Sequence, residues 1–428
     1  MQEKIIIAPS VGAEHQGKIV IDPVTGREYQ EADRLDDVNA RGKRVKWREH
    51  KLGAVRLAAV YDRIRRVQIC DGYNPLTGEE RLYRAFVRAS EIIRSYYAGK
   101  FFRIDWCATS LKFQPNPLTG KIKLHWANFC RLRLCPMCMW RRSLKIFRDV
   151  SIIMNHLEQE TDYKYIFLTL TAKNCSSEDL ERELNRYFKA FYKLFQRKEV
   201  RAISKGYMRA LEITRNWKNN TYHPHFHVII AVDKKYVNDK KLEDGYITQE
   251  RWVQLWRDCM GLDYNPIVDI RTVKRKDGQA TYSAAVAELA KYTLKPSDVM
   301  PELSFETKKA LGHDQDLIAL WQQRLDKKYA SQVDDNVMIL DAALSYRRLV
   351  AFGGEFKTIH KALNLDKKNI DNEDTMREDV ACVFIKYRWV PGLTDYYKVS
   401  MSAEERAMIA EERASFAERS RRRRSSRN

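Results

Sequence analysis

Apolar side chains in the middle of the chain follow two different repeats. From Tyr163 to Thr171 they alternate between two faces, which predicts a β-strand. The next apolar residues recur at helical spacing, and this helix is expected to begin at Ser176 or Ser177, with Asp179 placed for a capping box. Strand and helix patterns then continue to residue 298. Mixed elements of this length and order predict an α+β fold in which helices flank a central antiparallel sheet.

The residues before this block carry weaker patterns. About the first 45 residues have few periodic apolar positions, so loose packing is expected there. Helical repeats follow around residues 47 to 68 and 80 to 98. Residues 101 to 113 and 121 to 129 are strand-like and flank turn residues, which predicts a hairpin.

Three histidines alternate along a strand-like run that continues to Ile230. They are His223, His225 and His227, and residues two apart on a strand point to the same side of the sheet. Imidazole nitrogens are good ligands for divalent metals, and a strand holds them at a nearly fixed separation. The pattern predicts a metal site, and three unconnected surface histidines are the alternative interpretation.

The preceding strand-like run places a carboxylate near these histidines. If the hairpin turns through Asn219 and Asn220, Glu212 lies directly opposite His227 and is a candidate third ligand. An odd-length loop would move Glu212 to the other face of the sheet. A proline limits strand pairing beside His223, so that histidine is the expected outer member of the group.

A helix is expected from Ala284 to Leu294, with one apolar and one polar face. The polar face carries the side chains with candidate chemistry, namely Glu288, Lys291, Tyr292 and Lys295. A phenol has a pKa of about 10, so Tyr292 becomes a useful nucleophile only beside a cation, a metal or a base. The two lysines supply cations and candidate phosphate contacts. A solvated helix face is the alternative interpretation.

Three of the eight cysteines are clustered, at Cys130, Cys135 and Cys138. Cys107, on the expected partner strand, supplies a fourth thiol, and His125 is the other candidate for that position. Such a set suits tetrahedral structural zinc, with unligated thiols or redox chemistry as the alternatives. The remaining cysteines are scattered, and no disulfide framework is expected in a reducing compartment.

The charge of the chain favours an acidic partner. Lysine and arginine total 77 against 57 acidic residues, a formal net charge of +20, which favours nucleic acid or another polyanion. Arg141 and Arg142 beside the clustered cysteines are expected to contact phosphates. The arginine-rich end of the chain is either a non-specific nucleic-acid contact or a solubilising tail. With no run of about 18 apolar residues and no secretory signal, we expect a cytoplasmic protein without a membrane partner.

Three motifs in a fixed order carry a family resemblance. They are FLTLT at 167–171, HPHFH at 223–227 and AKYTLKPSD at 290–298. They closely resemble the motifs of single-tyrosine rolling-circle plasmid replication initiators, the Rep proteins of Gram-positive type in the HUH endonuclease superfamily. The segment NFCRLRLCPMCMWRR at 128–142 is similar to the cysteine segment of the same proteins. The resemblance implies an RRM-like, ferredoxin-like central sheet.

The resemblance also implies metal-dependent, origin-specific DNA nicking. On this basis His225 and His227 bind Mg²⁺ or Mn²⁺, with Glu212 or His223 as a further ligand. Tyr292 attacks the plasmid double-strand origin, giving a 5′-phosphotyrosyl intermediate and a 3′ hydroxyl that primes synthesis.

Further expectations follow from the same resemblance. Glu288 activates water for the final cut at termination, and Lys295 joins the catalytic residues. Thr169, Thr171 and Lys291 are expected DNA contacts. The expected partners are origin DNA that is single-stranded or extruded at the nick, the host helicase and the replication machinery.

Two other functions remain open at this point. A conjugative relaxase or single-strand transposase shares the histidine pair and the tyrosine. A non-catalytic zinc-containing protein that binds DNA or RNA by occupancy alone would not depend on Tyr292.

Five regions are expected along the chain. They are a polar and helical N-terminal region (1–98), a zinc-binding cysteine hairpin lobe (99–145), an HUH nicking domain (146–300), a mainly helical region (301–400), and a charged helix with a basic tail (401–428).

Overall fold

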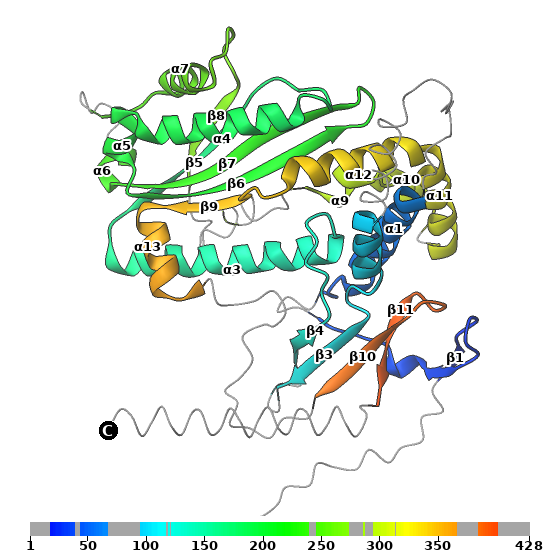
Figure 1. The fold of residues 1–428 in the computed structure, drawn as a ribbon. Helices are drawn as coiled ribbons and strands as arrows, with labels where there is room; N and C mark the ends of the chain where they lie inside the picture. The colour runs from blue at the N-terminus through cyan, green and yellow to red at the C-terminus, as the bar shows by residue number, and fades with distance from the viewer. Residues whose placement is uncertain are drawn as a thin grey trace, which may run out of the picture. The chain divides into compact units, whose positions relative to one another are not determined.

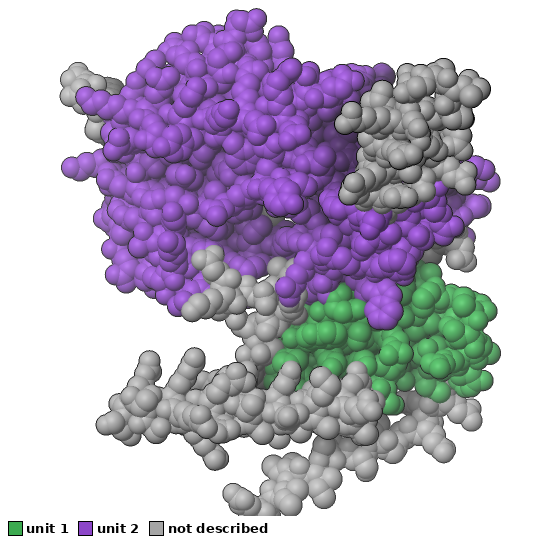
Figure 2. Space-filling view, viewed as in Figure 1, with its two compact units in different colours: residues 1–48, 108–128, 372–428 green, residues 49–107, 129–371 purple. Residues whose placement is uncertain are grey.

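The structure, a computed structural model, describes most of the chain. The described residues are 18–38, 43–66, 95–116, 119, 121–238, 245–273, 286, 294–312, 314–365 and 384–400. The chain forms two compact units (Figure 2). Unit 1 comprises residues 1–48, 108–128 and 372–428, and unit 2 comprises residues 49–107 and 129–371.

Unit 2 is built on a five-stranded antiparallel sheet in the order β8-β5-β7-β6-β9. Its strands are β5 (Lys164–Thr171), β6 (Gly206–Asn216), β7 (Thr221–Val232), β8 (Val268–Thr272) and β9 (Val350–Gly353). The strand predicted up to Thr171 and the histidine-bearing strand are confirmed as neighbours, β5 and β7. β9 is an edge strand that pairs with β6, although the sequence predicts mainly helix after residue 300.

Helices cover both faces of this sheet (Figure 1). α4 (Leu180–Gln196) and α7 (Gln249–Met260) lie on one face, and α3 (Pro136–Glu160) and α13 (Gly354–Ala362) lie on the other. The predicted antiparallel sheet flanked by helices is therefore confirmed.

The other helices are shorter or lie away from the sheet faces. They are α1 (Trp47–Arg66), α5 (Lys198–Ile203), α6 (Lys234–Asn238), α9 (Pro296–Val299), α10 (Phe305–Ala310), α11 (Gln315–Lys328) and α12 (Ala330–Leu344), and residues 95–105 are also helical. None of the helices in the described ranges combines the length and apolar character needed to cross a bilayer.

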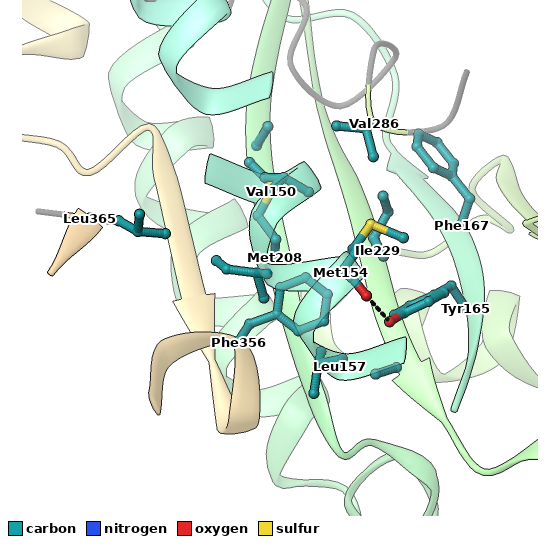
Figure 3. Packing of buried hydrophobic residues seen from close by; sticks show 13 residues of the cluster. Val150, Met154, Leu157, Tyr165, Phe167, Met208, Ile229, Val286, Phe356 and Leu365 are labelled. Carbon is teal, nitrogen blue, oxygen red and sulfur yellow. Dashed lines mark hydrogen bonds between the residues drawn. The ribbon is translucent and has the colours of Figure 1, made fainter. Parts of the chain in front are cut away.

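β7 shows why the sheet needs a helical layer on each side. Phe226, Val228 and Ile230 are fully buried on the α4 face, and Ile229 and Ala231 are equally buried on the α3 face. On the α3 face, Ile229 belongs to a cluster with residues of α3, β5 and β6 (Figure 3). Burying one such aliphatic side chain contributes about 1.5–3 kcal/mol, so both faces help to hold the strand.

α4 begins at Leu180, later than the predicted start at Ser176 or Ser177. Residues 177–179 form a turn, and Asp179 is the N-cap residue. The backbone N–H of Asp179 donates to Ser176 Oγ at 3.3 Å, so the serine stabilises the turn before the helix.

Unit 1 contains a second antiparallel sheet, in the order β11-β10-β3-β4. Its strands are β3 (Ser110–Pro115), β4 (Ile122–Ala127), β10 (Ile385–Val390) and β11 (Asp395–Val399). β3 and β4 confirm the predicted hairpin, but the preceding residues 101–105 are helical where the sequence predicts strand. A short apolar run fits either structure until its packing partner is known. β10 and β11 likewise replace predicted helix.

Part of the first 45 residues is folded, so the predicted loose packing is wrong there. β1 (Ile19–Ile21) pairs with β2 (Glu28–Gln30), and the 3-10 helix η1 (Glu31–Asp33) follows. Just beyond it, Arg34 forms an ion pair with Asp395 at 2.6 Å. The local sequence pattern does not predict this folded segment, because the residue that stabilises it lies some hundreds of positions away.

The two helices predicted before residue 100 have different outcomes. α1 confirms the helix predicted around residues 47 to 68. Of the helix predicted around 80 to 98, only residues 95–98 are described, and these are helical.

The two-sided burial of β7 generates a stability prediction. Ile229→Ala removes three buried carbon atoms from the α3 face and is expected to lower the free energy of unfolding by about 2–5 kcal/mol. Ile267→Ala is the matched control, because Ile267 is 78% exposed in the same unit and should change stability by less than about 0.5 kcal/mol. Urea denaturation followed by tryptophan fluorescence measures both. Equal effects of the two changes would contradict the assigned packing.

Candidate active site and metal centres

The hairpin of β6 and β7 brings a carboxylate and two imidazoles together. Glu212 pairs with His225 in the strand register, and Ala210 pairs with His227. The predicted register, with Glu212 opposite His227, is therefore wrong by two residues. Because the shift is even, Glu212 still lies on the face of the histidines.

The turn explains the shift. Four residues, 217–220, connect Asn216 to Thr221, in place of the predicted two-residue turn. Asn216 Oδ1 accepts the backbone N–H groups of Lys218 and Asn219, each at 3.0 Å, and Asn220 takes a positive φ of 54°. An asparagine side chain that accepts backbone N–H bonds favours this longer turn.

Glu212 is the centre of the cluster. Its Oε2 lies 3.0 Å from His227 Nε2 and 3.3 Å from His225 Nε2. Its Oε1 lies 2.8 Å from Lys295 Nζ. Glu212, His225 and His227 each offer a ligand atom, and these atoms lie within 4.8 Å of one another. The three residues can therefore hold one metal ion.

The second nitrogen of each imidazole is also engaged. Thr169 Oγ1 lies 3.3 Å from His227 Nδ1, and the backbone oxygen of His223 lies 3.2 Å from His225 Nδ1. Both Nε2 atoms consequently face Glu212. Partners of this kind hold metal-binding histidines in one orientation, so the donor set fits a divalent cation.

Electrostatics keep the carboxylate of Glu212 ionised. Burial raises its pKa, but hydrogen bonds with His225, His227 and Lys295 outweigh burial and hold the pKa well below its usual range. An ionised carboxylate beside two imidazoles is the charge pattern that a divalent cation requires.

His223 stands outside the group, although the sequence leaves it open as a replacement for Glu212. It pairs with Thr214, and its ring centroid lies 5.3 Å from that of His225. Burial, and then the neighbouring His225, lower its pKa. The geometry favours Glu212 as the third ligand.

The two threonines of the first motif lie beside the histidines. Thr169 pairs with His227 and Thr171 pairs with His225 across β5 and β7. The Thr171 hydroxyl donates to the backbone oxygen of Ile267 at 2.8 Å. Their expected contact with DNA stays a prediction, but Thr169 also orients an imidazole, which the sequence does not reveal.

The tyrosine segment is described only at its ends. Val286 is 1% exposed and belongs to the core cluster on the α3 face (Figure 3), and Leu294 is also 1% exposed. Glu288, Lys291 and Tyr292 lie outside the described residues. Lys295 is described, and its ammonium group contacts Glu212 of the candidate metal site.

The four predicted cysteines form a second candidate metal centre. The Cys138 Sγ lies 3.6 Å from Cys107 Sγ and 3.5 Å from Cys130 Sγ, and Cys135 Sγ lies 3.6 Å from Cys107 Sγ. A tetrahedron of thiolates around zinc, with bonds of about 2.3 Å, has edges of about 3.8 Å. All four side chains are buried. The group therefore has the size and composition of a structural zinc site.

Cys107 reaches this group from a turn after the helix at 95–105, and the prediction that it lies on a strand is wrong. His125, the other candidate for the fourth position, packs in unit 1 with its ring 4.4 Å from that of Phe384. Cys107 completes the group of ligand atoms, and His125 is not part of it.

Hydrogen-bond donors surround the sulfur atoms. The backbone N–H of Cys130 donates to Cys107 Sγ at 3.4 Å, and that of Arg131 donates to Cys138 Sγ at 3.2 Å. Lys51, which is 1% exposed, donates to the backbone oxygen of Cys107 at 2.9 Å. These donors and this buried cation favour negatively charged sulfur, the form that binds metal.

The thiols of the cluster titrate unequally. Hydrogen bonds with the other three cysteines hold the pKa of Cys138 well below its usual range, whereas burial raises the pKa of Cys135. Burial also lowers the pKa of Lys51. The sequence gives no sign of Lys51, because it lies far from the cysteines along the chain.

Arg141 and Arg142, the predicted phosphate contacts, interact with other residues of the protein close to this cluster. Arg141 is 4% exposed, with its guanidinium 5.5 Å from the centre of the Trp140 ring. Arg142 donates to the backbone oxygens of Leu132, at 3.1 Å, and Arg131. Their contact with DNA stays a prediction.

Comparison with known proteins identifies the family. A family model described as "Replication protein" matches residues 121–395. A "Protein rep" of Bacillus amyloliquefaciens is 36% identical over 383 residues, which cover 85% of this chain and 96% of that protein. The chain belongs to this replication protein family.

Other Rep proteins give the same result. A "Protein rep" of a Bacillus species is 41% identical over 276 residues, or 64% of this chain and 84% of the relative. Another, of Staphylococcus aureus, is 41% identical over 228 residues, or 53% of this chain and 96% of the relative. The Rep family of Gram-positive type that the motifs predict is confirmed. No solved structure matches the chain.

The cysteine centre generates a prediction about metal content. The purified protein is expected to contain one tightly bound metal ion and Cys135→Ser is expected to lack it, because one ligand of the tetrahedron is lost. Cys259→Ser is the matched control, since Cys259 is also buried but lies outside the cluster. Elemental analysis of the purified variants measures the effect. Undiminished metal in the Cys135 variant would show that these thiols do not bind it.

Proposed function

We propose that the protein is a plasmid rolling-circle replication initiator with an HUH-type nicking domain. In this proposal it cuts one strand at the double-strand origin and remains joined to the 5′ end through Tyr292. The freed 3′ hydroxyl primes leading-strand synthesis. Membership of the Rep family and the site on β6 and β7 support this function.

One observation carries the proposal. Lys295, from the third motif, contacts Glu212, which in turn contacts His225 and His227 of the second motif. Three peptide links separate Tyr292 from Lys295, so their Cα atoms lie within about 11 Å of each other in any conformation. The chain thus tethers the proposed nucleophile close to the proposed metal ligands.

The proposed nicking step exchanges one phosphate ester for another. The phenol oxygen of Tyr292 bonds to phosphorus, the bond from phosphorus to the 3′ oxygen breaks, and the phenol proton is balanced by the proton that the 3′ oxygen gains. Because the ester is conserved, the later joining step needs no outside energy source.

The residues around the phosphate have separate parts in this proposal. Glu212, His225 and His227 hold Mg²⁺ or Mn²⁺, which when bound neutralises charge on the phosphate oxygens. Lys295 adds a positive charge at the same place. The DNA is single-stranded or extruded at the cut. In a stacked duplex, the tyrosine and the metal site on the sheet could not easily reach the same phosphate.

At termination we propose that Glu288 activates a water molecule. This water, and not a tyrosine, then attacks the phosphorus, so the last cut is hydrolysis. For the cysteine cluster we propose structural Zn²⁺, which the four buried sulfur atoms and their N–H donors support.

The nucleophile has a direct test. Tyr292→Phe removes the phenol oxygen. In the presence of Mn²⁺, this variant is expected neither to nick a supercoiled plasmid carrying the origin nor to form the denaturant-resistant protein–DNA adduct. Tyr192→Phe is the control, because Tyr192 is 68% exposed on α4 and should leave both products unchanged. An adduct formed by the Tyr292 variant at the parent rate would mean that another residue is the nucleophile, whereas a parent protein that binds the origin without forming an adduct would favour binding by occupancy alone.

Termination has its own test. Glu288→Ala is expected to nick and attach normally but to fail in the final hydrolysis, so covalent intermediates accumulate. Glu306→Ala, an exposed glutamate, is the control. Gel analysis of products from a plasmid with two origin copies separates the two steps. Normal termination by the Glu288 variant would remove that residue from the mechanism.

A further inference from the structure

Asp298 is a buried carboxylate at the end of the third motif. It is 5% exposed, and both of its oxygens accept backbone N–H bonds. Oδ1 accepts from Arg215 at 3.0 Å, and Oδ2 accepts from Lys295 at 3.1 Å. One side chain therefore joins β6, the strand that carries Glu212, to the residue whose ammonium group contacts Glu212.

The edge of β6 explains why a carboxylate is useful at this place. β9 pairs with β6 only from Tyr207 to Ala210, and the next edge bond is donated by Leu211 to the backbone oxygen of Leu349 at 2.9 Å. Farther along, the N–H of Arg215 bonds to Asp298. Asp298 thus continues the edge pairing of the strand, and a buried N–H left without it would cost about 1–3 kcal/mol.

The backbone around Asp298 is fixed from two more directions. Asn336 of α12, which is fully buried, donates to the backbone oxygens of Asp298 at 2.9 Å and Val299 at 3.0 Å. Its own oxygen accepts the Tyr222 hydroxyl of β7 at 2.7 Å. Trp217 Nε1 also donates to the oxygen of Ser297 at 2.8 Å. The short helix α9, with its N-cap residue Lys295, is therefore tied to both strands of the hairpin that carries the candidate metal ligands.

Burying the carboxylate of Asp298 is energetically unfavourable. Burial raises the pKa of Asp298, and the two backbone N–H bonds offset only part of that effect. An apolar side chain would fill the space without this penalty. A carboxylate at this place instead bonds to two chain segments and holds them in one register.

We propose that Asp298 is a positioning residue of the active site. It fixes Lys295 against Glu212, and because Lys295 lies three positions after Tyr292, it also fixes the end of the tyrosine segment. It touches neither DNA nor the reacting atoms in this role. The inference rests on the proposed nicking function.

The test compares Asp298→Ala with a matched buried carboxylate. Asp149 of α3 is 2% exposed, pairs with Lys145 and Arg148 of the same helix, and is not part of the group of Glu212, His225 and His227. Both variants are expected to lose stability. Only Asp298→Ala is expected to slow single-turnover adduct formation on a single-stranded origin oligonucleotide, by on the order of 100-fold. Its Kd for the oligonucleotide should change little. Asp298→Asn keeps one accepting oxygen and should recover part of the rate.

Rates are compared at a temperature where thermal melting shows the parent and all variants folded. A second measurement does not depend on activity. Amide hydrogen exchange at Arg215 and Lys295 is expected to accelerate in Asp298→Ala and to stay slow in Asp149→Ala.

The outcomes separate the two proposals. If the parent forms the adduct and Asp298→Ala slows it no more than Asp149→Ala does, the positioning role is wrong and the nicking function stands. Unchanged exchange at Arg215 and Lys295 would equally overturn the positioning role. If the parent forms no adduct, the proposed function and this inference both fail.

Discussion

The structure around the candidate active site depends on one buried carboxylate. Glu212 accepts contacts from His225, His227 and Lys295, which come from two different parts of the sequence. A carboxylate buried on a sheet is unfavourable unless positive or hydrogen-bonding groups surround it. The hairpin register and the position of the third motif must therefore both be correct for this residue to be tolerated.

The sheet makes such a site possible because it is covered on both faces. Apolar residues of β7 beyond the histidines are buried under α4 on one side and α3 on the other, which holds the strand rigid. The histidines lie on the α3 face, where apolar packing gives way to polar side chains. Ligands carried by a rigid strand keep their separation, which metal binding and in-line phosphoryl chemistry both require.

The cysteine cluster follows the same physical rule with softer ligands. Four sulfur atoms meet in the interior of unit 2, where backbone N–H groups donate to two of them and Lys51 donates to the backbone oxygen of Cys107. In both candidate centres buried polar groups are matched by partners from elements that are distant in sequence. Local sequence therefore supplies the ligands, and the fold supplies the partners.

The sequence by itself determined the antiparallel sheet with flanking helices, the paired histidines and the three clustered cysteines, because each depends on periodicity or spacing within a short segment. Its motifs also carried the resemblance to the Rep family. Only the tertiary structure decided the four-residue turn, the strands β9, β10 and β11, Glu212 over His223 and Cys107 over His125 as candidate ligands, and the contacts of Thr169, Lys51 and Asp298. Those features depend on hydrogen bonds and burial between distant segments, and the cost of an unpaired buried group is not visible until both segments are in place.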